Sequence, residues 1–144
     1  MKSTLVFVDT PENGKRGTLR GLIILPIYCI LTILWFYMTK KLYASKVDNV
    51  SNFRKLLSLF LSGVLIVSAI AVHTPDTRLK AVVYGGLVGF VIYGITNSVL
   101  IAISKKWTYT ISIIDTTWGI ISTAFLSYIL YEIVEQWPNI FKVV

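Results

Sequence analysis

The chain has 144 residues, of which 55% are hydrophobic and 15% are charged, and its formal net charge is +7. Soluble domains carry about 25% charged residues, so this composition, with a mean hydropathy of +0.71, argues against a soluble single-core domain and for lipid as the solvent. The single Cys and single His exclude an intramolecular disulfide and a Cys/His metal centre.

Four apolar segments are long enough to cross a hydrocarbon core, which takes about 20 residues of α-helix. They cover residues 21–38, 56–72, 81–104 and 109–131, and none of them contains Lys or Arg. Backbone groups in lipid must be satisfied within the segment, and the alternation of barrel strands is absent. The sequence therefore predicts an all-α integral membrane four-helix bundle.

The first segment is either a cleaved secretory signal or a retained helix. It follows 20 residues that include Asp9 and Glu12, and no small-x-small cleavage site comes after it. These features favour retention as a helix. The second segment is the weakest candidate for a span, because its 17 residues include three serines.

The connections between the four segments are short. They cover residues 39–55, 73–80 and 105–108. Short connections make consecutive helices antiparallel, which predicts an up-down-up-down order. In the second connection, Thr74 resembles an N-cap, Pro75 a first helical residue and Asp76 an acid of the first turn, so we expect the third helix to begin there.

Residues 1–20 are predicted to form an extra-membranous N-terminal arm, separate from a transmembrane domain over residues 21–144. Leu5 to Val8 is a short β-prone run, and Pro11 to Gly17 is rich in turn formers and charge. The arm is either a disordered tail or a docking arm that orders on a partner, with strand addition through Leu5 to Val8 as one route.

The basic residues divide equally between the two predicted membrane surfaces. Seven lie on the side of the termini and seven on the side of the first and third connections, and all except Lys2 lie within about 15 residues of a helix end. This distribution predicts contact with anionic lipid headgroups. It argues against nucleic-acid binding, because no basic run is interleaved with aromatics. The equal division leaves the membrane orientation open.

Polar side chains from all four segments are predicted to reach one layer of the membrane. Asp115 is the key residue, because a carboxylate inside a membrane helix is costly and normally faces a partner or a water-filled cavity. It lies nine residues beyond Lys106, which is about 13 Å deeper. Polar residues at nearly the same depth on the other three segments are Thr32, Ser62 and Asn97.

Small and polar residues share one face on each of the last two segments. On the third segment they are Gly86, Gly89, Tyr93 and Asn97, and on the fourth they are Asp115, Gly119 and Ser122. Ala81, Gly85 and Gly89 also form a small-xxx-small pattern, which permits close approach of backbones. We therefore expect the third and fourth helices to pack tightly, with Asn97 near Asp115 and Tyr93 beside them.

This polar layer has two interpretations. It is either interhelical hydrogen bonding centred on Asp115, or a proton-relay or small-solute site that uses Asp115. The segments contain no Lys, Arg or His to complete an ion-coupled pump. No nucleophile and base set, phosphate loop or paired acids occur, so we expect no enzyme activity, no cofactor and no metal site.

The stretch from Tyr84 to Gly119 carries a Gly-rich start, Tyr93, Lys105, Trp107, Asp115 and the pair Trp118 and Gly119. This pattern, with the run from Leu34 to Val47, resembles a family of small four-helix predicted membrane proteins of unknown function, found in bacteria and large algal DNA viruses. The resemblance covers about residues 27–131. Where that family carries acids on its first and third helices, this chain has Thr32 and Asn97.

The resemblance implies that the fold is retained, while neutral residues replace two of the family's three intramembrane acids. It suggests a multi-pass membrane protein with a structural or assembly role, such as a viral membrane or minor capsid component that anchors a protein shell to a bilayer. Capsid proteins, bound through the N-terminal arm or the basic loops, would then be partners, and the location would be a cell membrane or a virion membrane. The alternative is a small transporter or proton- or solute-conducting protein that uses Asp115.

Overall fold

The computed structural model describes residues 11–44, 52–72 and 75–137, and it describes side chains within 18–41, 61–71 and 75–137. The described residues form four α-helices and no strand. The helices are α1 (Pro11–Ala44), α2 (Asn52–Val72), α3 (Arg78–Ile103) and α4 (Tyr109–Gln136). The predicted all-α helical bundle is confirmed.

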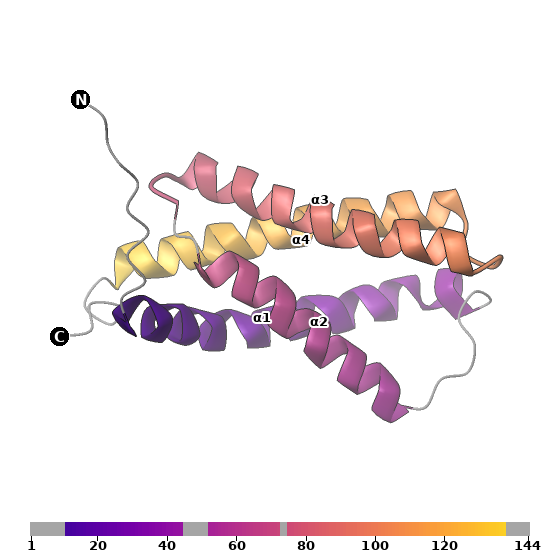
Figure 1. Ribbon diagram of the computed structural model, residues 1–144, viewed down its shortest axis with the longest axis horizontal. Helices are drawn as coiled ribbons and strands as arrows, with labels where there is room; N and C mark the ends of the chain where they lie inside the picture. Colours follow the sequence, from indigo (N-terminus) through magenta and orange to yellow (C-terminus); the bar gives the residue numbers. More distant parts are fainter. Residues whose placement is uncertain (1–10, 45–51, 73–74, 138–144) are drawn as a thin grey trace.

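The four helices alternate in direction, as predicted from the short connections. Figure 1 shows α3 and α4 side by side along their length, while α1 runs beneath them and α2 crosses α1 obliquely. The start of α1 and the end of α4 lie at one end of the bundle, and the turn between α3 and α4 lies at the other (Figure 1). The extensive α3–α4 contact and the α1–α2 crossing define two packing units joined through α4.

Three of the helices are long and apolar enough to cross a membrane. The spans are Thr18–Lys41, Arg78–Ile103 and Tyr109–Gln136, with hydropathies of 2.1, 2.0 and 1.4. In α2 the apolar stretch with described side chains, Leu61–Ala71, is shorter than a span, so a fourth crossing stays a prediction. Large apolar side chains such as Phe36, Phe90 and Ile113 point outward, which suits lipid and would be a liability in water.

Helix α3 begins later than predicted. Thr77 is its N-cap, and the Thr77 hydroxyl accepts a hydrogen bond from the Lys80 amide at 3.3 Å. Pro75 and Asp76 precede the helix, so the expected start at residues 74–76 is wrong. The physical reason is that the Thr77 hydroxyl caps the first turn, whereas the Asp76 carboxylate pairs with the Lys80 ammonium at 2.9 Å.

Helix α1 begins earlier, and helix α4 ends later, than the apolar segments predicted from the sequence. Helix α1 begins at Pro11, within the expected turn-rich part of the arm, because proline is tolerated in a first helical turn where its missing N–H costs nothing. The β-prone run Leu5 to Val8 lies outside the described residues. Helix α4 begins at Tyr109 as predicted, with Thr108 as its N-cap, and continues to Gln136.

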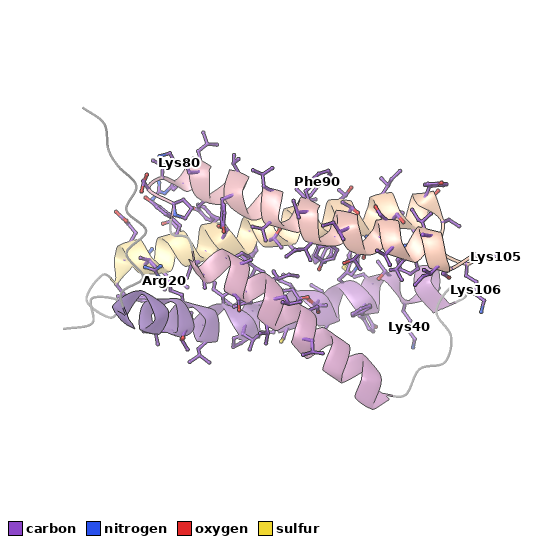
Figure 2. All side chains as sticks on the ribbon, in the orientation of Figure 1. Arg20, Lys40, Lys80, Phe90, Lys105 and Lys106 are labelled. Atoms are coloured by element: carbon purple, nitrogen blue, oxygen red, sulfur yellow. The ribbon has the colours of Figure 1, made fainter. Side chains whose placement is uncertain are left out.

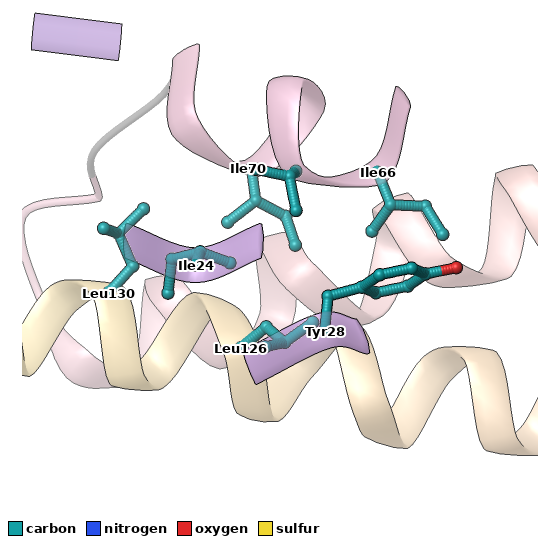
Figure 3. Close-up of a cluster of buried hydrophobic side chains, with 7 residues drawn as sticks. Ile24, Tyr28, Ile66, Ile70, Leu126 and Leu130 are labelled. Carbon is teal, nitrogen blue, oxygen red and sulfur yellow. The ribbon is translucent and has the colours of Figure 1, made fainter. Parts of the chain in front are cut away.

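An apolar cluster joins α1 and α2 to α4. Its buried members are Ile24, Tyr28, Ile66, Val67, Ile70, Leu126 and Leu130. In Figure 3 the Ile66 and Ile70 side chains of α2 point toward Ile24 and Tyr28 of α1, with Leu126 and Leu130 of α4 beside them. We call this set the α1–α2–α4 cluster. It fixes α1 and α2 against the α3–α4 pair.

Candidate functional site

The α3–α4 interface is built on glycines that allow the two backbones to touch. A Cβ on Gly85 would meet the Thr123 backbone oxygen and, at 2.6 Å, the Ser127 Cβ. A Cβ on Gly89 would meet the Thr123 hydroxyl and the backbone of Gly119. Neither position has room for a side chain, so these glycines permit the close approach expected of a small-xxx-small stripe.

Larger side chains follow the glycines along the same face of α3. The Tyr93 ring lies directly over Gly119, where any Cβ would overlap it. Gly86 differs from the other predicted packing residues, because a Cβ there would make only an ordinary contact with Ile120 at 3.6 Å. The structure thus places Gly85, Gly89 and Gly119 in the interface and leaves Gly86 at its margin.

Asn97 and Asp115 meet one turn beyond Tyr93. The Asn97 side chain is 2% exposed, and its Nδ2 donates to Asp115 Oδ2 at 2.9 Å, to Thr116 Oγ1 at 3.3 Å and to the Tyr93 carbonyl at 2.9 Å. Asp115 is partly buried and lies about 9 Å from the start of α4. The two residues that the sequence placed at one depth therefore hydrogen-bond directly.

Trp107 fixes which way the Asn97 amide points. The Trp107 indole Nε1 donates to Asn97 Oδ1 at 2.8 Å. Because an indole N–H can only donate, the amide oxygen must face Trp107 and the amide nitrogen must face Asp115. The Asp115 Oδ2 atom therefore acts as a hydrogen-bond acceptor.

The short turn after α3 positions this indole. The Ser104 amide donates to the Leu100 carbonyl at 2.9 Å and the Trp107 amide donates to the Ser104 carbonyl at 3.1 Å, which folds the chain back toward Asn97. The position of Trp107 beside an apolar segment is typical of an aromatic anchor at the membrane interface. No local signal marks its bond to Asn97, because that bond depends on the geometry of the turn.

Thr32 and Ser62 belong to a different group of polar residues. The Thr32 hydroxyl donates to the Tyr28 carbonyl of its own helix at 2.9 Å, and the Ser62 hydroxyl pairs with the Tyr28 hydroxyl at 3.1 Å. The predicted set of mutual bonds around Asp115 is therefore wrong for Thr32. A threonine in a helix commonly bonds to the carbonyl four residues earlier, and equal depth does not place two side chains on facing surfaces.

An aromatic pair links α1 to α4 close to Asp115 in sequence. The Trp35 and Trp118 rings stack with centroids 4.5 Å apart and planes 3° from parallel. Trp118 follows Asp115 by three residues, about one helical turn. Among the described residues, the buried Trp35 Nε1 and Ser112 Oγ atoms have no hydrogen-bond partner. A tryptophan near the end of an apolar segment is typical of a membrane anchor, and no local sequence signal predicts this contact.

The chemistry available at this site is hydrogen bonding around one carboxylate. Within the described part of the chain, no group of three His, Cys, Asp or Glu side chains could hold a metal ion. Asp115, Asn97, Thr116 and Trp107 instead join α3, its following turn and α4. This arrangement stabilises a helix pair, and its one carboxylate is the group that could exchange a proton.

The chain matches a known protein family over most of its length. No curated protein and no solved structure matches the chain. A family model described as predicted membrane protein (DUF2177) matches residues 19–131, a stretch that contains both the polar group around Asn97 and the α1–α2–α4 cluster. The chain therefore belongs to the DUF2177 family of predicted membrane proteins.

Proposed function

We propose that this protein is a structural and assembly element of a membrane, in which the α3–α4 pair forms a rigid core. The observation that carries the proposal is the hydrogen bonding of the Asn97 side chain. Its amide nitrogen and its amide oxygen are both engaged by protein groups, in an interface where Gly85 and Gly89 leave no room for a Cβ. Asp115 is thereby engaged in holding two helices together, which suits a scaffold.

A narrower form of the proposal is that the bundle anchors a protein shell to the bilayer, as a viral membrane or minor capsid component would. The shell would contact the N-terminal arm, residues 1–20, or the basic loops. This form is supported by the family resemblance and by the lysines at one end of the bundle. Co-purification of the full chain with a particle is the observation that would identify such a partner.

A second candidate is a small transporter or proton-conducting protein that uses Asp115. The observation that favours it is partial exposure, because Asp115 is only partly buried although it lies inside an apolar span. Intramembrane carboxylates commonly mark proton or solute pathways. The two candidates differ in whether the Asp115 carboxylate must exchange protons or only accept a hydrogen bond.

Reconstitution in liposomes separates the two candidates. Wild type and Asp115→Asn are compared for proton flux with a pH-sensitive dye and for thermal stability, with Thr117→Ala as a matched control, because the Thr117 hydroxyl is exposed and bonds only within α4. We expect proton flux equal to that of protein-free liposomes in all samples and nearly wild-type stability for Asp115→Asn, because its amide oxygen can still accept the hydrogen bond from Asn97. Wild-type flux that Asp115→Asn abolishes without loss of folding would contradict the structural role.

A further inference from the structure

The two ends of the bundle carry different charges. Figure 2 shows Arg20 and Lys80 at one end and Lys40, Lys105 and Lys106 at the other. Among the described side chains, the first end holds three basic and three acidic residues, namely Arg20, Arg78, Lys80, Asp76, Glu132 and Glu135. The charged side chains described at the surface of the second end are all lysines, namely Lys40, Lys41, Lys105 and Lys106, which we call the lysine end.

The first end pairs its charges within the protein. Arg78 binds Glu132 through Nε and Oε1 at 2.6 Å and through Nη2 and Oε2 at 3.4 Å. Lys80 binds Asp76 at 2.9 Å. Although each exposed pair contributes little stability, the basic and acidic side chains described at this end balance each other.

The lysine end lies at one membrane boundary. Ala44 is nine residues after Trp35 and Tyr109 is nine residues before Trp118, and the two tryptophans are stacked. The end of α1 and the start of α4 therefore lie at the same level, about 13 Å beyond the stack. The turn containing Lys105 is at that level. The Lys40 backbone lies about 6 Å nearer the bilayer centre, a distance that a lysine side chain can span to bring its ammonium group to the headgroups.

Exposed apolar side chains adjoin both lysine pairs. Tyr37 and Met38, which precede Lys40, are 80% and 69% exposed, and Ile103 and Tyr109, which flank the turn, are 75% and 74% exposed. The turn itself is held by the bonds from Trp107 to Ser104 and Asn97. A ligand that matches this surface has an anionic head beside the ammonium groups and apolar chains beside these side chains.

We propose that Lys40, Lys41, Lys105 and Lys106 form one surface that binds the phosphate headgroups of anionic phospholipids. The acyl chains lie against the adjoining apolar side chains of α1, α3 and α4. Near a membrane surface, each lysine contributes about fivefold to the attraction of anionic lipid. The inference is independent of the structural role proposed above, since a transporter could carry the same surface.

Lipid retention measured by native mass spectrometry tests the proposal. The full-length protein in detergent is given equal amounts of phosphatidylglycerol and phosphatidylcholine. We expect wild type to retain phosphatidylglycerol preferentially, and the fourfold variant with Lys40→Gln, Lys41→Gln, Lys105→Gln and Lys106→Gln to lose the preference by about tenfold or more. The control Arg78→Gln with Lys80→Gln, at the first end, should retain it. Equal retention of both lipids by wild type overturns the proposal.

Two further arms keep the result decisive if the fourfold variant does not fold. In wild type, 0.5 M salt should reduce the preference, because the Debye length falls to a few Å; an undiminished preference would overturn the electrostatic basis.

Replacing the four lysines by arginine should preserve the preference, and its loss counts against charge recognition. Glycerol phosphate at equal concentration should not displace the lipid, and displacement would mean that the surface binds soluble phosphate esters.

Discussion

The α3–α4 interface and the α1–α2–α4 cluster solve the same packing problem in opposite ways. In the interface, Gly85 and Gly89 bring two backbones into contact, and Asn97 and Asp115 hydrogen-bond across it. In the cluster, Ile24, Ile66, Ile70 and other large side chains fill the space between three helices. Both regions lie in one family-matched segment, residues 19–131.

The difference shows what replaces the hydrophobic effect within a bilayer. Apolar side chains gain little by leaving lipid for protein, so association depends on van der Waals contact and hydrogen bonds. The interface obtains these contacts from close backbone approach, and the cluster obtains them from shape-filling branched side chains. The interface should therefore tolerate no added atoms, whereas the cluster should tolerate no removed atoms.

Enlarging Gly89 should have the largest effect. In Gly89→Leu the new side chain would overlap the Thr123 hydroxyl and the Gly119 backbone, which forces the helices apart and lowers the free energy of unfolding by about 3 kcal/mol or more. The measurement is unfolding by SDS in mixed micelles, followed by circular dichroism. Gly94→Leu is the control, because a Cβ there meets nothing within 4 Å. Equal losses for the two variants would refute the role of close approach.

Truncating Ile70 should have a smaller but clear effect. Ile70 is 1% exposed in the α1–α2–α4 cluster, so Ile70→Ala leaves a cavity and should lower the free energy of unfolding by about 2 kcal/mol. The value lies at the low end for core truncations because, on unfolding, the Ile70 side chain moves from the protein into lipid or detergent rather than into water. Leu65→Ala, at a position 67% exposed on the same helix, should change little in the same SDS assay. A larger loss at Leu65 would show that α2 packs differently.

The bond between Asn97 and Trp107 should give the smallest of the three effects. A double-mutant cycle with Asn97→Ala and Trp107→Phe should report a coupling of about 0.6–1.7 kcal/mol, the range for interhelical hydrogen bonds in membranes. Thr96→Ala provides the control cycle, because the Thr96 hydroxyl is exposed and bonds to the Ile92 carbonyl of its own helix. Zero coupling between Asn97 and Trp107 would mean that the indole does not hold the amide.

Several features were predictable because they depend on spacing along one helix. The depth of Asn97 and Asp115 follows from their distance to Lys105 and Lys106, and their faces follow from the helical repeat, so their meeting could be anticipated. Thr32 also has the right depth, but its hydroxyl bonds to Tyr28 within α1. Depth is a property of one helix, whereas a contact also requires the rotation of the neighbouring helix, which sequence spacing does not contain.

The lipid environment, the helical class, the alternating order and a carboxylate at a defined depth could all be predicted from the sequence alone. These follow from composition and from local spacing, because lipid forces each backbone segment to satisfy its own hydrogen bonds. Three contacts could be seen only in the folded molecule: the bond from Trp107 to Asn97, the stack of Trp35 on Trp118, and the ion pair between Arg78 and Glu132. These features depend on turn geometry and on how helices rotate against each other, which are set by packing between distant parts of the chain.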